Sequence, residues 1–185
     1  MAVVSAVAGL LLAAGGGRRF GMPKALAPYR GGLLVEHAVR ALADCRPRVV
    51  VLGAGAERVP PLDAVVVVNE VWTSGMGSSL RLGLSALAET DAVAAVVLPV
   101  DTPGVTAAAV ARLAALAAPD ALARASYDGA PGHPVLIGRA HWAGVAELAV
   151  GDTGARPYLA RHPAVDVPCA DVADGADADR PEELT

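Results

Sequence analysis

The sequence predicts a single α/β domain with an open, doubly wound and mostly parallel β-sheet. Aliphatic runs rich in valine recur through the first 100 residues, and they are apolar throughout rather than alternating. Strands that are covered on both faces have this composition. The stretches between them space their large apolar residues three and four apart, which is the period of a helix packed on one side. Right-handed connections between such strands produce a Rossmann-like sheet.

The length and composition fit one domain over residues 1–185. The formal net charge is −4, so a broad nucleic-acid surface is not expected and any basic cluster must be local. Cys45 and Cys169 show neither a disulfide framework nor zinc-ligand spacing. The apolar residues 3–14 are too few to span a membrane and follow no basic residue. We therefore expect a cytoplasmic protein with no nucleic-acid or membrane partner.

The first two thirds of the chain predict elements in the order β-α-β-β-α-β-α. Ser78 or Ser79 can cap the second helix, Thr106 can cap the third, and Pro119 ends it. Strands are expected at residues 7–14, 48–53, 64–68 and 92–100, and helices at residues 34–45, 78–89 and 107–118.

The last third predicts a short antiparallel element at the far side of the sheet. Residues 123–138 have the pattern of two short strands around a turn rich in glycine and proline. Helices near residues 139–149 and 154–161, a short strand at 164–168 and an acidic tail complete the chain.

The loop after the first strand is rich in glycine and strongly basic. Residues 10–26 read LLLAAGGGRRFGMPKAL. Ligands of open α/β sheets bind beyond the carboxyl ends of the strands, so this loop lies in a favoured place. Its glycines let backbone N–H groups approach phosphate oxygens, and Arg18, Arg19 and Lys24 can neutralise them. The loop therefore predicts an anionic ligand.

Two familiar phosphate-binding loops do not fit this stretch. The dinucleotide fingerprint Gly-x-Gly-x-x-Gly would need glycine at Phe20, and residues 53–58 also lack the third glycine. A P-loop needs Gly-Lys-Ser/Thr after four variable residues. Here Met22 and Pro23 precede Lys24, and no hydroxyl residue follows.

The pattern that does fit is Leu-x-Ala-Gly-x-x-x-Arg-x-Gly-x-x-Lys, at residues 12–24. It resembles the signature of nucleotidyltransferases that activate sugars, isoprenoid precursors and molybdopterin, and most closely that of the molybdenum cofactor cytidylyltransferase family. Five further blocks resemble that family in the same order and extend over nearly the whole chain. They are NEVWTSGMGSSLRLGL (69–84), LPVDTPGV (98–105), GAPGHPVLIGRAHW (129–142), GDTGARPYL (151–159) and DADRPEEL (177–184).

Three positions depart from the family pattern. Gly17 stands where serine is common, Phe20 where methionine is common, and Arg180 replaces a threonine in the tail. The first two change loop contacts without removing a charge, whereas Arg180 bears on how the acidic pair of the tail is placed. Ala14 gives the Leu-Ala-Ala-Gly form, which resembles the cytidylyl branch more than the guanylyl branch.

The resemblance implies a Mg²⁺-dependent nucleotidyltransferase, with Mn²⁺ as a second option. It would transfer CMP from CTP to the terminal phosphate of molybdopterin and release pyrophosphate. Residues 1–105 would bind the nucleotide and residues 106–185 the acceptor. A client molybdoenzyme or its chaperone is the further partner implied.

The same resemblance assigns residues to four roles. Arg19, Lys24 and Asp101 are expected to be catalytic, and His133, Asp152 and Arg156 to bind the acceptor. Asp101, Asp177 and Asp179 are the expected metal ligands. The expected nucleotide-binding residues are Leu12, Ala13, Ala14, Gly15, Gly16, Gly17, Arg18, Arg19, Lys24, Asn69, Ser74, Gly75 and Ser79.

Each role has an ordinary structural alternative. Asp101 should emerge at the carboxyl end of an apolar strand, where its carboxylate suits Mg²⁺, but it could cap the following turn. Asp152 and the Ser78–Ser79 pair could serve as helix caps. Arg18 could face solvent, and a basic turn can be merely solvated.

Two other functions compete with cytidylyl transfer to molybdopterin. One keeps the chemistry and changes the substrates, to GTP or to another phosphorylated acceptor such as a sugar phosphate. The other is a carrier or chaperone that escorts the cofactor without catalysis. Arg19, Lys24 and Asp101 count against a carrier, because a carrier has no need for a triphosphate loop beside a metal carboxylate.

Overall fold

A seven-stranded sheet forms the middle layer of the computed structural model, which describes residues 6–184. The strand order is β5-β4-β1-β6-β8-β7-β9. In this part of the chain β8 runs antiparallel to its two neighbours, and the other six strands are parallel to one another. The strands are β1 (Val7–Ala13), β4 (Arg48–Leu52), β5 (Val65–Val68), β6 (Ala94–Pro99), β7 (Leu122–Tyr127), β8 (Ala130–Gly138) and β9 (Val165–Pro168).

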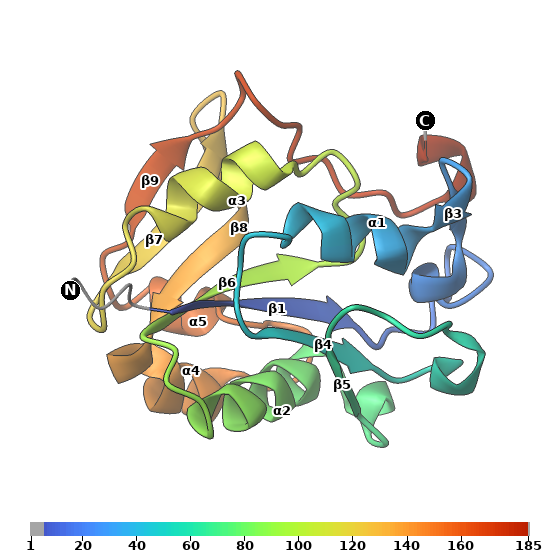
Figure 1. Cartoon of the computed structure of the whole chain (residues 1–185), viewed down its shortest axis with the longest axis horizontal. Coiled ribbons are helices and arrows are strands. Elements are labelled where there is room, and N and C mark those ends of the chain that lie inside the picture. Colours follow the sequence, from blue (N-terminus) through green and yellow to red (C-terminus); the bar gives the residue numbers. More distant parts are fainter. Residues whose placement is uncertain (1–5, 185) are drawn as a thin grey trace.

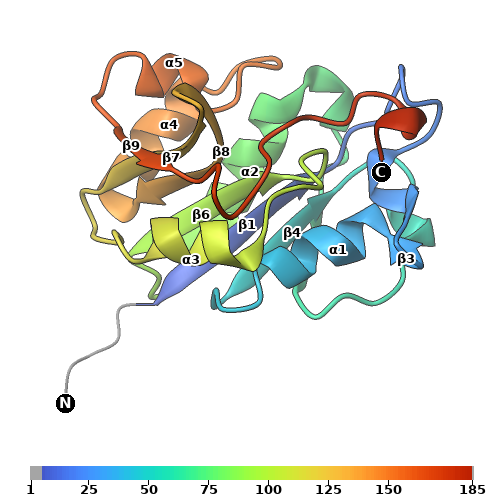
Figure 2. The same cartoon turned by 90° about the horizontal axis from the view of Figure 1, so that it is seen from above.

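Helices cover both faces of this sheet, as Figure 2 shows from above. One face carries α1 (Leu34–Ala41) and α3 (Ala107–Ala114). The other face carries α2 (Met76–Ala88), α4 (Trp142–Leu148) and the short α5 (Arg156–Leu159). Each face of the sheet packs against its helices in an apolar core, and successive residues of β1 point into opposite cores. Leu11 packs with α1 and α3, and Leu10 packs with α2 and α4. The predicted doubly wound α/β fold is confirmed.

The order and type of the main elements follow the prediction, while several helix ends differ. Helix α1 ends at Ala41 and α3 at Ala114, each about one turn earlier than the sequence pattern suggested. The chain turns there so that Cys45 and the residues before Pro119 lead directly into β4 and β7. A small hairpin of β2 (Pro28–Tyr29) and β3 (Gly32–Leu33) was not predicted, because it has two residues per strand.

The prediction that the valine run at residues 64–68 is covered on both faces is wrong. This run forms β5 at the edge of the sheet, where Val65 is 55% exposed and Val68 52%. An apolar run predicts a strand but does not say how many neighbours the strand has. The antiparallel hairpin of β7 and β8 is confirmed, although β8 is longer than expected at nine residues.

The carboxyl ends of β1, β4 and β6 lie at the same edge of the sheet (Figure 1). The glycine-rich loop after β1 therefore lies beside the loops that contain Gly53 and Asp101. None of the helices within residues 6–184 is long and apolar enough to cross a membrane.

Candidate active site

Gly17 bends the loop after β1 into a tight turn. Its φ is +64°, and its carbonyl accepts a hydrogen bond from the Gly21 N–H at 2.8 Å. A Cβ atom at this position would lie 1.9 Å from the Met22 carbonyl oxygen. The serine that is common here in the resembled family therefore does not fit this turn. The turn brings Lys24 back to the edge of the sheet, where a short 3₁₀ helix (Lys24–Leu26) begins.

Lys24 meets two carboxylates at this edge. Its Nζ donates hydrogen bonds to Asp101 Oδ2 at 3.0 Å and to Asp179 Oδ1 at 2.9 Å. The side chain of Lys24 is 15% exposed and that of Asp101 25%. Burial, the largest influence, lowers the pKa of Lys24, but the hydrogen bonds and charges of Asp179 and Asp101 together raise it above its ordinary value. The lysine is therefore held in its charged form between the two carboxylates.

The C-terminal strap, residues 174–184, runs back to this loop (Figure 2). The Asp174 N–H donates to the Gly104 carbonyl at 3.1 Å, and the Ala178 N–H donates to the Asp101 carbonyl at 2.8 Å. These bonds place Asp179 beside Lys24, and the hydrogen bond from Lys24 lowers the pKa of Asp179. The substitution at Arg180 therefore leaves the acidic tail docked at the site.

Asp177 lies two residues before Asp179 in the strap. Partial burial of its carboxylate and the nearby charges of Asp101 and Asp179 raise its pKa. Within residues 6–184, no group of three or more His, Cys, Asp or Glu side chains is arranged to hold a metal ion. Asp101 and Asp179 nevertheless both contact the ammonium group of Lys24. Such a pair of hard oxygen donors also suits Mg²⁺ or Mn²⁺.

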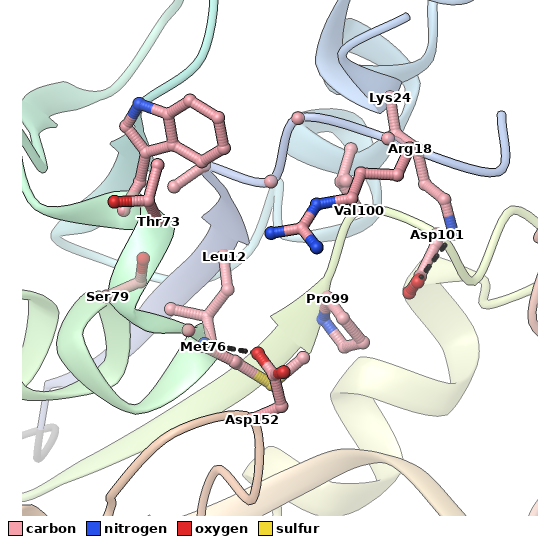
Figure 3. A pocket seen from close by; sticks show the side chains of 16 residues that line it. Leu12, Arg18, Lys24, Thr73, Met76, Ser79, Pro99, Val100, Asp101 and Asp152 are labelled. Atoms are coloured by element: carbon pink, nitrogen blue, oxygen red, sulfur yellow. Dashed lines mark hydrogen bonds and ion pairs between the residues drawn. The ribbon is translucent and has the colours of Figure 1, made fainter. Parts of the chain in front are cut away.

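A cavity of about 380 Å³ opens beside the loop after β1. Lys24, Arg18 and Asp101 lie at one end of it, and Thr73 and Ser79 at the other (Figure 3). Arg18, an expected nucleotide-binding residue for which a solvent-facing position was the alternative, lines the cavity, whereas Arg19 is 82% exposed and lies 3.8 Å from Asp179. The predicted nucleotide residues in this wall are Leu12, Ala14, Gly15, Gly16, Gly17, Arg18, Lys24, Gly75 and Ser79.

Four predicted nucleotide residues lie outside this wall, and their role stays a prediction. Ala13 points to the opposite core because successive strand residues alternate, and Arg19 reaches Asp179 instead. Asn69 is buried, and its Nδ2 donates to Ser78 Oγ at 2.8 Å and to Ser79 Oγ at 2.9 Å. Ser74 donates its hydroxyl to the Val71 carbonyl. Asn69 thus fastens the segment before α2 to that helix.

Asp152 links the loop after α4 to the start of α2. Its Oδ1 accepts a hydrogen bond from the Met76 N–H at 3.3 Å, at the start of α2. It therefore caps a helix that is distant in the sequence rather than the next one. The approach requires Gly75, whose φ is +107° and whose Cβ would lie 2.5 Å from the Gly151 carbonyl oxygen.

A second cavity of about 440 Å³ adjoins the first. His133, Asp152 and Arg156, the predicted acceptor residues, all line it, and so does Asp177. Burial, more than the positive charge of Arg156, lowers the pKa of His133, and the charge of Asp101 opposes this shift. The Tyr127 hydroxyl donates to the His133 carbonyl at 2.7 Å and fixes this part of the wall.

Arg124 is a wall residue of the second cavity that sequence reasoning missed. Its Nε donates to Asp166 Oδ1 at 2.6 Å, from β7 to β9. A single charged residue in an otherwise apolar or small strand, LARASY, is the signal that could have indicated it.

A protein-family model described as a MobA-like NTP transferase domain matches residues 9–167. The chain belongs to this family. The match includes the loop after β1, the Asp101 segment and the His133 and Asp152 segments, and it ends before Gly175 and Asp177 of the second cavity. The predicted nucleotidyltransferase family is confirmed at this level.

Two curated relatives of this MobA-like domain bear names of different classes. Nicotine blue oxidoreductase of Paenarthrobacter nicotinovorans is 40% identical, over 96% of this chain and 94% of that protein. A probable molybdenum cofactor guanylyltransferase of Bacillus thuringiensis (strain Al Hakam) is 32% identical, over 56% of this chain and 52% of that protein. The chain therefore matches about half of the guanylyltransferase and nearly all of the oxidoreductase.

Solved structures support the MobA-like fold. The crystal structure of Rv0371c from Mycobacterium tuberculosis H37Rv is 26% identical, with a TM-score of 0.81 over 97% of this chain and 95% of that chain. A second structure of Rv0371c, in complex with manganese, gives 26% identity and a TM-score of 0.75 over 89% and 88% of the two chains.

Proposed function

We propose that this MobA-like protein transfers CMP from CTP to the terminal phosphate of molybdopterin and releases pyrophosphate. One observation carries the proposal: the two cavities adjoin and share Asp101 in their walls. A triphosphate in the first cavity and a phosphorylated acceptor in the second would meet at that carboxylate. Holding two polyanions in contact is the main task of an enzyme that catalyses this reaction.

The chain's own residues divide the work. Arg18 and Lys24 would neutralise the triphosphate, and the backbone N–H groups of the loop after β1 would bind its oxygens. Arg19, 3.8 Å from Asp179, would add charge at the transition state. His133, Asp152 and Arg156 would hold the acceptor so that its phosphate faces the α-phosphorus.

Asp101 and Asp179 would hold a divalent cation, Mg²⁺ or Mn²⁺, with Asp177 as the nearest further carboxylate. When bound, that cation neutralises charge on the phosphates. The manganese complex of Rv0371c supports a divalent ion in this fold.

Ala14 supports cytosine as the base. Its buried methyl group lines the first cavity, and its carbonyl already accepts the Ala54 N–H at 3.0 Å. A methyl group at this place takes room that a purine would need. GTP as the nucleotide, or a sugar phosphate as the acceptor, is the alternative within the same chemistry. A client molybdoenzyme or its chaperone would receive the product.

The relative named nicotine blue oxidoreductase gives a second candidate function. The second cavity has an aliphatic wall that includes Leu80, Val97, Val135 and Leu159, and such a wall suits a flat conjugated ring. The reaction would move a hydride from NADH or NADPH to that ring, with a proton from water completing the reduction.

One set of assays separates these functions. Pyrophosphate release is measured with CTP, GTP, UTP or ATP, Mg²⁺ and purified molybdopterin, and NADH oxidation is measured in parallel with a conjugated quinoid dye. We expect pyrophosphate release that requires CTP and molybdopterin. Pyrophosphate release with GTP, or with a sugar phosphate as acceptor, would show that the protein uses those substrates instead. Dye reduction without pyrophosphate release would favour an oxidoreductase. Molybdopterin binding without either reaction would favour a carrier.

A further inference from the structure

The two ends of the first cavity differ in charge. Arg18, Lys24 and Asp101 lie together at one end, whereas the side chains at the other end, Thr73 and Ser79, are neutral (Figure 3). Asp152 lies between the two ends, where it accepts a hydrogen bond from the Met76 N–H. A nucleoside triphosphate would place its phosphates at the charged end, because a polyanion is stabilised there. Its base would then lie at the neutral end. This step rests on the proposed function.

Trp72 directly precedes Thr73 of the neutral end, lines the same cavity and is packed against two glycines. A Cβ atom at Gly16 would lie 2.9 Å from Trp72 Cη2 and Cζ3, and a Cβ atom at Gly53 would lie 2.7 Å from Trp72 Cβ. The indole can approach both loops this closely because neither residue carries a side chain. It therefore cannot withdraw further toward either loop to enlarge the cavity.

The segment that carries Trp72 is also held by hydrogen bonds from Asn69. Asn69 Oδ1 accepts the Val71 N–H at 3.1 Å, while its Nδ2 is bonded to Ser78 and Ser79 at the start of α2. The Gly75 N–H donates to the Trp72 carbonyl at 3.1 Å. These bonds hold Trp72 on a short 3₁₀ helix (Trp72–Ser74) against the cavity.

We infer that Trp72 determines base size: its fixed indole closes the neutral end and admits a single-ring base in preference to a purine. A purine carries one more fused ring than a pyrimidine. To accommodate it, the indole would have to leave its contacts with Gly16 and Gly53. This selection differs from that by Ala14, because it acts through a side chain of the segment before α2 rather than through a side chain of the loop after β1.

Equilibrium binding of CTP, UTP, GTP and ATP, measured by dialysis without acceptor, tests the inference. Trp72→Ala should raise the purine-to-pyrimidine affinity ratio about 10-fold or more, the scale on which a binding pocket discriminates by size. Trp72→Phe should give an intermediate ratio. Val71→Ala is the matched control, because Val71 is exposed and its side chain lies outside both cavity walls, and it should keep the wild-type ratio.

The outcomes separate this inference from the proposed function. Equal weakening of all four triphosphates by Trp72→Ala, or a wild type that prefers purines, would overturn the role of Trp72. A wild type that binds no triphosphate and releases no pyrophosphate would overturn the proposed function itself. Circular dichroism confirms that each variant is folded, and Trp72→Phe carries the test if Trp72→Ala does not fold.

Discussion

Lys24 Nζ lies 3.0 Å from Asp101 Oδ2, although the two residues are 77 positions apart in the chain. Sequence reasoning gave them different partners, the triphosphate for the lysine and a metal ion for the aspartate. The structure pairs them with each other, so a ligand that takes up either group must replace this contact. Both residues are therefore expected to influence phosphate binding and metal binding together.

Replacing Lys24 by alanine should lower kcat by about 10²–10³-fold, the usual effect of losing one donor that stabilises transition-state charge. The fold should persist, because Lys24 belongs to neither apolar core, but the melting temperature should fall, because loss of the 15% exposed lysine leaves Asp101 and Asp179 without their cation. Steady-state pyrophosphate release and a thermal melt measure the two effects. Arg58→Ala, which removes an exposed cation paired with Glu57, is the control and should keep full activity. Normal turnover in the Lys24 variant would remove this residue from the mechanism.

Asp101→Asn should reduce activity steeply and weaken Mn²⁺ binding, because the amide keeps the size of the side chain but lacks the charge that a hard cation needs. Electron paramagnetic resonance of free Mn²⁺ gives the binding constant independently of turnover. Asp44→Asn removes an exposed carboxylate elsewhere and serves as the control. Wild-type Mn²⁺ binding and activity in the Asp101 variant would make this residue a turn cap.

Ala14→Gly should narrow the preference for CTP over GTP. The methyl group of Ala14 lines the first cavity, and one methyl group is worth about 1–3 kcal/mol, roughly 10 to 200-fold in kcat/KM. Competition between the two triphosphates gives the ratio directly. A GTP preference that this variant leaves unchanged would show that base selection lies elsewhere.

Gly17→Ala should raise the KM for the triphosphate by distorting the loop after β1. The new Cβ would meet the Met22 carbonyl oxygen at 1.9 Å. Gly21→Ala is a matched control, because Gly21 also has positive φ but its Cβ would have open space within 4 Å. Both variants carry the cost of a left-handed conformation, so a larger KM effect at Gly17 isolates the clash. Equal effects would show that the clash is relieved without cost.

Much of the fold follows from local patterns in the sequence. The valine runs and the three-and-four spacing are local features, and they predicted the strands and helices around Leu11 and Leu84 correctly. Exposure of β5 depends on which strand lies at the edge, and no local pattern of residues 64–68 records that.

The candidate site could be predicted as a set of segments but not as a set of contacts. The spacing of glycines and cations indicated the loop after β1. It did not indicate that Arg18 lines the cavity while Arg19 lies near Asp179 of the strap, because these directions depend on the turn at Gly17. The side-chain amide of Asn69 donates hydrogen bonds to the hydroxyls of Ser78 and Ser79. This contact depends on how the segment before α2 lies against that helix. Arg124 lines the second cavity because β7 lies beside it, and the sequence does not record which cavity a strand borders.

The docking of the C-terminal strap has a consequence for synthesis of the protein. Asp179 is 155 residues beyond Lys24, and the Ala178 N–H binds the Asp101 carbonyl. During translation the sheet residues of β1, β4 and β6 emerge from the ribosome well before the strap does, and chains begin to fold from the N-terminal side. A nascent chain thus exposes Lys24 and Asp101 while the second carboxylate is still missing, and the site gains Asp179 only after that residue has left the ribosome.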